Sequence, residues 1–212
     1  MSLRVATPLA VKEACAHLSR VDRHLKSTIG NVGPVRFAPT KTGHFAYLVR
    51  AIIYQQLAGR AAATIHGRVI ALLGDEVTPE RILNKSAEEL RAAGVSANKF
   101  LALQDLSLRA HSGALVLDDR ELARLEDQEI INELSGVRGV GPWTAQMFLM
   151  FQLRRLDVWP IGDLGVRKGY GLIHSAPELS PKQLELAGER LRPYRSVAAV
   201  YCWRAIDLAR GG

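Results

Sequence analysis

Two glycines that bracket one valine and precede a proline, Gly139-Val140-Gly141-Pro142, constrain the fold of this 212-residue chain most strongly. Glycine accepts positive φ and brings no side-chain bulk, and proline fits the first turn of a helix. The segment therefore predicts a very tight turn between two helices. It is either an ordinary αα-hairpin or one whose outward N–H groups and helix dipole bind a phosphate.

Helical periodicity dominates the rest of the chain. Apolar residues recur at helical spacing from Phe45 to Ile53, and a second helix is expected over 59–73. Capping residues and proline mark further helix starts, at Thr78-Pro79, Ser86, Ser96 and Asp127. Two more helices are expected over 181–191 and 194–209. Because strand signals are scarce, we predict an all-α fold with two helical lobes and a cleft between them.

Composition excludes several classes of protein. The chain has 28 Lys and Arg against 21 Asp and Glu, a formal net charge of +7, with 48% hydrophobic residues. These values are ordinary for a globular protein and exclude a disordered chain. The positive balance weakly favours a polyanionic partner. Two cysteines cannot build a four-cysteine zinc or iron–sulfur site, and the six histidines lack the spacing of paired metal ligands.

The chain shows no membrane or export signal. No run approaches the roughly 18–20 apolar residues that span a bilayer, and the first residues lack the apolar core of a signal peptide. We therefore expect no membrane partner. The expected location is the cytoplasm of a bacterium, or the nucleus in a eukaryote.

Asp163 stands between Gly162 and Leu164, just before an expected helix. Its simplest role is an N-cap that accepts backbone N–H bonds. A second role is compatible with the first, because a fixed carboxylate can stabilise a cation that develops during a reaction.

Four sequence blocks resemble one family in its order. They are Ala51–Leu57, Gly94–Lys99, Val137–Ala145 and Trp159–Gly165, with a weaker fifth block at Arg192–Trp203. Together they resemble the helix-hairpin-helix/Gly-Pro-Asp DNA glycosylases over about residues 45–205. Within these, the chain is most similar to the 3-methyladenine DNA glycosylase II branch.

The resemblance implies a monofunctional glycosylase of base excision repair. Such an enzyme flips a damaged base out of double-stranded DNA and hydrolyses its N-glycosidic bond, here in alkylated purines such as 3-methyladenine and 7-methylguanine. Asp163 matches the catalytic carboxylate, which stabilises the oxocarbenium-like sugar and orients or deprotonates the attacking water. The alternatives are a noncatalytic DNA-binding or damage-sensing module, and a glycosylase for ethenoadenine, hypoxanthine or oxidised guanine.

The resemblance also places four residues in the base pocket: Trp143, Met147, Leu164 and Trp203. Trp143 stands where bifunctional relatives carry a Schiff-base lysine, so no lyase activity is expected. Its indole suits a cationic purine. Met147 and Leu164 replace aromatic residues of the bacterial relative, which implies a less aromatic pocket. Core packing is the alternative for Trp143, and packing of the C-terminal helix is the alternative for Trp203.

DNA contacts are implied at two places. Leu57, beside Gln55 and Gln56, matches the position of an apolar wedge; its alternative role is to continue the apolar stripe that contains Ile53. Gln55 and Gln56 are polar where that stripe would be apolar, which favours a role facing DNA or the other lobe. The resemblance further implies that backbone phosphates are met at the hairpin, by Gly139, Gly141 and Thr144.

The same hairpin matches a cation site of the family. The backbone carbonyls of Ser135, Val137 and Val140 would hold a structural sodium or potassium ion. No cofactor is expected to be required, and no iron–sulfur cluster is expected.

We expect residues 46–164 to form the helix-hairpin-helix lobe. Residues 1–45 and 165–212 would form the second lobe, with DNA and Asp163 at the cleft. The segment before the first block is too short for the extra β-rich domain of the bacterial relative. A monomer is expected, because one concave cleft is enough to grip DNA.

Overall fold

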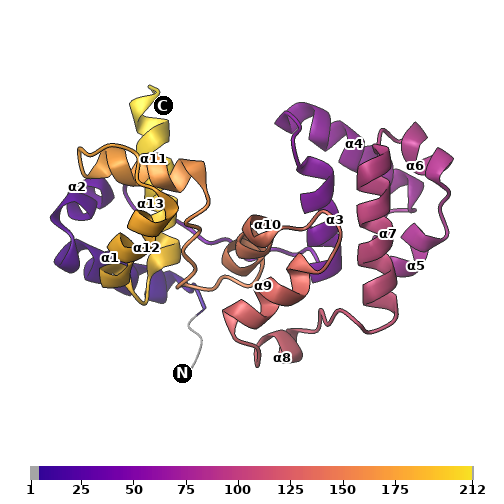
Figure 1. The fold of residues 1–212 in the computed structure, drawn as a ribbon, viewed down its shortest axis with the longest axis horizontal. Helices are drawn as coiled ribbons and strands as arrows, with labels where there is room; N and C mark the ends of the chain where they lie inside the picture. Colours follow the sequence, from indigo (N-terminus) through magenta and orange to yellow (C-terminus); the bar gives the residue numbers. More distant parts are fainter. Residues whose placement is uncertain (1–4, 212) are drawn as a thin grey trace. The chain divides into compact units, whose positions relative to one another are not determined.

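The computed structural model describes residues 5–211, which form helices joined by turns (Figure 1). Within this range the β-type pairing is limited to an isolated antiparallel bridge between Val5 and Arg155. The predicted all-α fold is therefore confirmed. No helix in the described range is long and apolar enough to cross a membrane.

The chain divides into two compact units. Unit 2 is Thr40–Phe148, and unit 1 combines Met1–Pro39 with Leu149–Gly212. The predicted limits, 46–164 and 1–45 with 165–212, differ most at the second boundary. The segment that follows Phe148 belongs to unit 1 because its side chains bond to later helices of that unit. Trp159, for example, donates its indole N–H to the Leu184 carbonyl at 2.8 Å.

Unit 2 contains the hairpin and the helices before it. These helices are α3 His44–Tyr54, α4 Gly59–Leu72, α5 Pro79–Leu83, α6 Ala87–Ala92, α7 Ala97–His111, α8 Asp119–Leu122, α9 Asp127–Ser135 and α10 Pro142–Met147. The predicted caps at Thr78, Ser86 and Ser96 are confirmed, since each side chain accepts a backbone N–H of its helix. The cap predicted at Asp127 is wrong. Glu126 occupies that position and forms a reciprocal capping box with Glu129.

The apolar stripe predicted on α3 lies in the core of unit 2. Leu48, Val49, Ile52 and Ile53 are fully buried, and α7 contributes the buried Leu103 to the same unit. Burying each such side chain contributes roughly 1.5–3 kcal/mol. This packing fixes the end of α3, from which the Gln55–Leu57 segment leaves.

Unit 1 is built from both ends of the described chain. Its helices are α1 Pro8–Val21, α2 Arg23–Val32, α11 Leu164–Ile173, α12 Pro181–Gly188 and α13 Arg195–Ala209, with a short 3-10 turn η2 at Glu189–Leu191. The π-helical turn η1, Phe148–Gln152, contains the boundary between the units. The predicted helix over 181–191 thus ends as α12 and continues only as the 3-10 turn.

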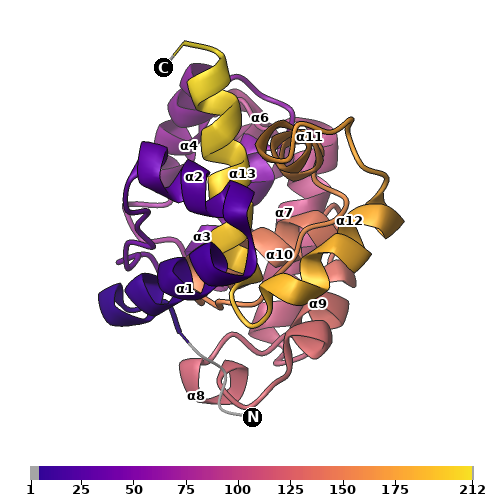
Figure 2. The ribbon, with the colours of Figure 1, turned by 90° about the vertical axis from the view of Figure 1, so that its left-hand side faces the viewer.

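A close crossing of α11 and α13 organises unit 1 (Figure 2). Gly169 of α11 lies against the α13 backbone, where an added Cβ would come within 2.0 Å of the Cys202 carbonyl oxygen. Any side chain at this position would force the helices apart. The crossing therefore brings the start of α11, which Asp163 caps, close to Trp203 of α13.

Candidate active site

Asp163 is the N-cap of α11, as predicted. One carboxylate oxygen, Oδ1, accepts the backbone N–H of Val166 at 2.7 Å and the indole N–H of Trp203 at 2.9 Å. The side chain is half-buried, and it lies at the positive end of the helix dipole. A negative charge is thus held in a fixed direction by neutral donors of its own unit.

Trp203 is placed by a ring contact as well as by this hydrogen bond. Its ring centroid lies 6.0 Å from that of Phe151, and the two rings are inclined by 31°. Gly165 leaves the space that the indole occupies, because a Cβ there would lie 2.8 Å from Trp203 Cδ1 and 3.0 Å from Asp163 Oδ1. Phe151 and Gly165 therefore support the pair, a role that the sequence analysis missed although Gly165 ends one of its blocks.

The neighbouring Cys202 does not offer a second reactive group. Burial, and then the negative charges of Asp163 and Asp22, raise the pKa of the Cys202 thiol well above its usual range. A thiol is nucleophilic as the thiolate, so Cys202 acts here as a packing residue beneath the α11–α13 crossing.

In unit 2, the segment between α9 and α10 forms the predicted hairpin. The turn is closed by two backbone bonds, from Val137 N–H to the Leu134 carbonyl and from Val140 N–H to the Val137 carbonyl, both 3.0 Å. Both valines are buried. Asp105 of α7 accepts the Arg138 N–H at 2.7 Å, so the turn is anchored to the helix beside it.

The two glycines of the hairpin have different structural roles. Gly139 has a φ of +76°, and its Cβ position lies 3.2 Å from Ala102 Cβ. Gly141 is the N-cap of α10 with an extended backbone at φ −95°, and nothing lies within 4 Å of its Cβ position. A positive φ thus explains the need for glycine at position 139 only. At position 141, the absence of a side chain leaves open space at the start of α10.

Gln55 joins the end of α3 to the hairpin. Its side-chain amide donates to the Gly139 carbonyl at 2.9 Å and to Thr144 Oγ1 at 3.4 Å. Thr144 is buried, so its hydroxyl faces the interior of unit 2. Of the predicted DNA-contacting residues, Gln55 and Thr144 therefore use these side-chain groups in hydrogen bonds within unit 2.

Gln56 and Leu57 project from the chain after α3 ends at Tyr54. Gln56 has an unusual positive φ of 57°, a conformation uncommon for residues other than glycine. Leu57 is 38% exposed. The alternative in which Leu57 continues the core stripe of its helix is wrong, because the backbone leaves the helix before Leu57 is reached.

Lys99 holds the end of α3. Its ammonium group donates to the Ile53 carbonyl at 2.7 Å, where the carbonyls at a helix end otherwise lack partners. Burial lowers the pKa of Lys99. Lys99 belongs to one of the motif blocks, but no local pattern indicates its role, since the contact spans 46 residues.

The remaining predicted pocket residues lie on the surfaces of the two units. Trp143, in the first turn of α10, is 49% exposed, and Leu164, in the first turn of α11, is 48% exposed. Met147 is half-buried, and its carbonyl accepts the hydroxyl of Tyr47 at 3.2 Å. A core position for Trp143, the alternative to its role in the pocket, is wrong.

Two of the three carbonyls expected to hold a cation lack a backbone donor in the described range, whereas that of Val137 accepts the Val140 N–H. No backbone N–H among residues 5–211 donates to the carbonyls of Ser135 and Val140, and the buried Ser135 hydroxyl has no hydrogen-bond partner within the same range. Unpartnered oxygens of this kind call for a ligand such as an ion. In the described part of the chain, no cluster of three or more His, Cys, Asp or Glu could hold a metal.

Comparison with known proteins gives the family of this chain. Residues 49–193 match the HhH-GPD superfamily of base excision DNA repair proteins. The chain belongs to this superfamily. The match includes the hairpin and Asp163, and it extends into the start of the segment that carries Trp203.

Members of the HhH-GPD superfamily are also similar to the chain over its length. The DNA-3-methyladenine glycosylase 1 of Schizosaccharomyces pombe is 36% identical over 94% of this chain and 90% of its own length. The structure of a 3-methyladenine DNA glycosylase of that yeast, in complex with abasic DNA, aligns with a TM-score of 0.81 at 33% identity, covering 94% of this chain and 99% of that one.

A bacterial structure agrees with this result. The DNA-3-methyladenine glycosidase of Bacillus halodurans aligns with a TM-score of 0.84 at 35% identity, covering 100% of this chain and 95% of that one. The HhH-GPD fold therefore extends over the described chain, including the N-terminal helices that lie outside the family match.

Proposed function

We propose that this protein is a monofunctional DNA glycosylase that hydrolyses the N-glycosidic bond of alkylated purines in double-stranded DNA. The observation that carries the proposal is the Asp163 carboxylate, held at the N-terminus of α11 by Val166 N–H and Trp203 Nε1. The HhH-GPD family match and the alkylbase glycosylases among the relatives support it.

Asp163 acts on the sugar of the flipped nucleotide. As the bond between C1′ and the base breaks, the base leaves with the electron pair and positive charge develops on the sugar. A fixed carboxylate stabilises that charge without reorganising during the reaction. Water then adds at C1′, and its proton passes to Asp163 or to solvent. One carboxylate is enough, because an N-alkylated purine is already cationic and leaves readily.

Trp143 gives the proposal its monofunctional character. Strand cleavage through a Schiff base needs an amine at this position, and an indole cannot supply one. The exposed indole instead offers a face for a cationic purine, an attraction of about 0.5–2 kcal/mol. Met147 and Leu164, which the family resemblance places in the base pocket, are aliphatic, and Trp203 is the second aromatic residue assigned to it.

The hairpin binds the DNA backbone in this proposal. The open space at Gly141 lets a phosphate approach the first N–H groups of α10. A sodium or potassium ion on the carbonyls of Ser135, Val137 and Val140 would add positive charge on the same side. Leu57 serves as the wedge that stabilises the unstacked step. The protein acts as a monomer, in the bacterial cytoplasm or a eukaryotic nucleus.

Base release from methylated duplex DNA tests the proposal. Free 3-methyladenine and 7-methylguanine are separated by chromatography, and strand breaks are scored before and after alkali. We expect both bases to be released and breaks to appear only after alkali. Breaks before alkali would overturn the monofunctional assignment. Salt-sensitive binding without release from DNA containing any lesion would indicate a noncatalytic module instead.

A further inference from the structure

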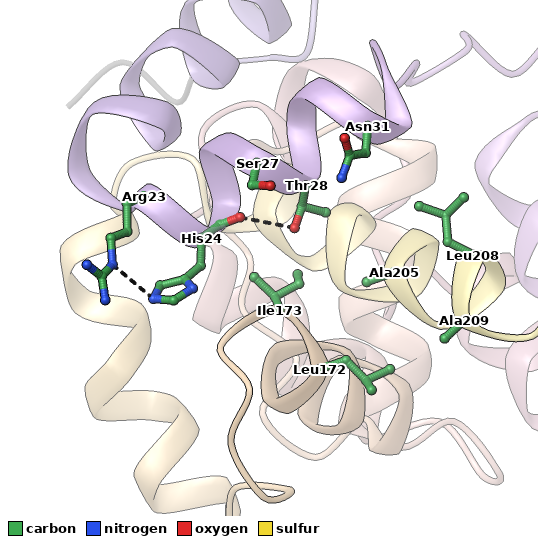
Figure 3. A pocket seen from close by; sticks show the side chains of 10 residues that line it. All are labelled: Arg23, His24, Ser27, Thr28, Asn31, Leu172, Ile173, Ala205, Leu208 and Ala209. Carbon is green, nitrogen blue, oxygen red and sulfur yellow. Dashed lines mark hydrogen bonds between the residues drawn. The ribbon is translucent and has the colours of Figure 1, made fainter.

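Unit 1 has a hollow on its surface that Asp163 does not line (Figure 3). It has a volume of about 480 Å³ and lies between α2, the end of α11 and the end of α13. Arg23, Ser27, Thr28 and Asn31 line it from α2. Leu172 of α11 and Leu208 of α13 form part of the walls that face α2.

A neighbouring hollow of about 720 Å³ extends this one. The two share Asn31 and Leu208, and the second adds Arg36, Arg204 and Arg210 to the lining. Together they form one groove, called here the α2–α13 groove. Asp207 is the only carboxylate among the residues that line it, and it lies 3.7 Å from Arg204.

Three arginines of the groove are not neutralised by the protein. Arg23, Arg36 and Arg210 form no ion pair with any carboxylate among residues 5–211, and Arg23 bonds only to the ring of His24. Other arginines of unit 1 are paired with carboxylates, at Arg167–Glu178, Arg190–Asp22, Arg192–Asp157 and Arg195–Asp157. The groove therefore contains positive charges that carboxylates of the described residues do not neutralise.

The charge of the whole chain is divided unequally between its units. Unit 1 contains 16 Lys and Arg against 8 Asp and Glu, whereas unit 2 contains 12 against 13. Unit 1 therefore carries a net charge of +8 and unit 2 a net charge of −1. Counterion release requires Lys and Arg that reach phosphates, and unit 1 holds more of them than unit 2 and fewer carboxylates that would repel a polyanion.

We propose that the α2–α13 groove binds the phosphate backbone of duplex DNA beyond the damaged nucleotide. This inference rests on the proposed function, because it assumes that DNA is the substrate. Asp163 caps one end of α11 and Leu172 lies near the other, about 14 Å along the helix axis. One DNA strand advances about 3.4 Å per nucleotide, so the groove would contact nucleotides outside the reaction site.

The chemistry of the lining favours duplex backbone over other polyanions. Arginine, serine, threonine and asparagine are the side chains that commonly contact phosphates and sugars. Single-stranded DNA is held largely by stacking on aromatic rings, and apart from the imidazole of His24 no aromatic ring lines the groove. The aliphatic walls at Ile173 and Leu208 suit the apolar edge of deoxyribose. An acidic peptide would use the same arginines and is an outcome of the test.

The test compares double variants in their binding to an undamaged duplex across a range of KCl concentrations. For Arg36→Ala/Arg210→Ala, the slope of log K against log salt should become shallower by about 0.9 for each phosphate that the variant no longer neutralises. The control, Lys26→Ala/Lys182→Ala, removes the same charge from unit 1 at exposed residues that do not line the groove and should keep the wild-type slope. Arg36→Lys/Arg210→Lys should restore the slope, since a phosphate accepts either cation.

Several results would overturn the inference. An unchanged slope in the alanine variant would mean that the groove does not meet DNA, and an equal change of slope in the control would mean that only total charge matters. Competition of polyglutamate for the groove, with no change of slope, would assign it to an acidic protein partner. For Arg36→Ala/Arg210→Ala, we expect the kcat of base release from a saturating methylated duplex to equal that of the wild type. Absence of release from the wild type would refute the proposed function and leave the binding slopes interpretable.

Discussion

The indole Nε1 of Trp203 donates a hydrogen bond of 2.9 Å to Oδ1 of Asp163, across 40 residues of sequence. The same oxygen accepts the Val166 N–H, so two donors from different helices fix the direction of one carboxylate. Because the donors are neutral, the charge of Asp163 is oriented without being cancelled by them. This arrangement suits a group that stabilises a developing cation.

Replacing Asp163 by asparagine should remove the charge and keep the fold. Asparagine is as good an N-cap as aspartate, so α11 should remain capped. We expect base release from methylated DNA to fall by at least about 100-fold, the scale of losing one electrostatic stabiliser. Single-turnover release and duplex binding measure the two properties separately. Undiminished release would exclude Asp163 from the reaction.

Trp203→Phe should slow the reaction by loosening Asp163. An aromatic ring beside Phe151 is kept, but the N–H donor is removed. A hydrogen bond to a charged group contributes about 1.5–3 kcal/mol, so kcat should fall by roughly 10- to 100-fold, with little change in duplex binding.

Trp159→Phe is the matched control for this variant. It removes another indole N–H of unit 1, the one that donates to the Leu184 carbonyl. It should lower the free energy of unfolding and leave kcat nearly unchanged. If both variants lower kcat equally, Trp203 has a merely structural role.

Gly165→Ala should disturb the same pair by steric contact. The new Cβ would lie 2.8 Å from Trp203 Cδ1 and 2.9 Å from Nε1, so the indole must move and its hydrogen bond must lengthen. We expect kcat to fall by about 10-fold, the effect of about 1.4 kcal/mol. Gly162→Ala is the control, because nothing lies within 4 Å of its Cβ position. Equal kcat values for the two variants would contradict a packing role for Gly165.

Local features of the site were predictable from sequence, whereas its long-range contacts were not. The caps at Thr78, Ser86 and Asp163 depend on a few neighbouring residues, and the structure has all three. The bond from Trp203 to Asp163 depends on the crossing of α11 and α13, which no local pattern encodes. Through the family resemblance, the sequence indicated that Trp203 and Asp163 belong to the site, but it did not indicate that they form a hydrogen bond.

The end of α3 illustrates the same limit. Periodicity alone allows the apolar stripe to continue to Leu57, four residues after Ile53. The helix stops at Tyr54 because the Ile53 carbonyl is bound by Lys99 and Gln56 adopts a positive φ. Likewise, the boundary between the units depends on long-range contacts such as the bond from Trp159 to the Leu184 carbonyl rather than on a change of composition, and the predicted limits differ from it.

The two hairpin glycines should respond differently to alanine. Gly139→Ala places a side chain at positive φ, a cost of about 1–2 kcal/mol, and brings its Cβ close to Ala102. Gly141→Ala has room and an ordinary backbone, so its free energy of unfolding should change by less than about 0.5 kcal/mol. The added methyl of Gly141→Ala should instead weaken duplex binding, if a phosphate approaches there.

Urea unfolding and duplex binding distinguish these two effects. Loss of stability without weaker binding in Gly141→Ala would contradict its role at the phosphate. Full stability of Gly139→Ala would contradict the requirement for positive φ.

The last prediction concerns Asp22, which is 3% exposed and links three helices of unit 1. It caps α2, accepting the N–H groups of His24 and Leu25, and its other oxygen lies 2.8 Å from His174 Nε2 and 2.7 Å from Arg190. Burial alone would raise the pKa of this carboxyl. The His174 and Leu25 hydrogen bonds, with the charges of His174 and Arg190, outweigh burial and lower the pKa from 3.8 to about 2.

A lowered carboxyl pKa stabilises the fold above the unfolded-state value and loses that effect as the pH falls. Asp22 should therefore contribute about 2 kcal/mol above pH 4, lost as the pH falls through 2. Asp22→Asn keeps an N-cap acceptor and removes the charge, so the variant should be less stable at pH 7, with the difference shrinking from pH 4 to 2. Urea unfolding of both proteins from pH 2 to 7 measures this difference. A difference that stays constant down to pH 2 would mean that Asp22 acts through packing and capping rather than through its charge.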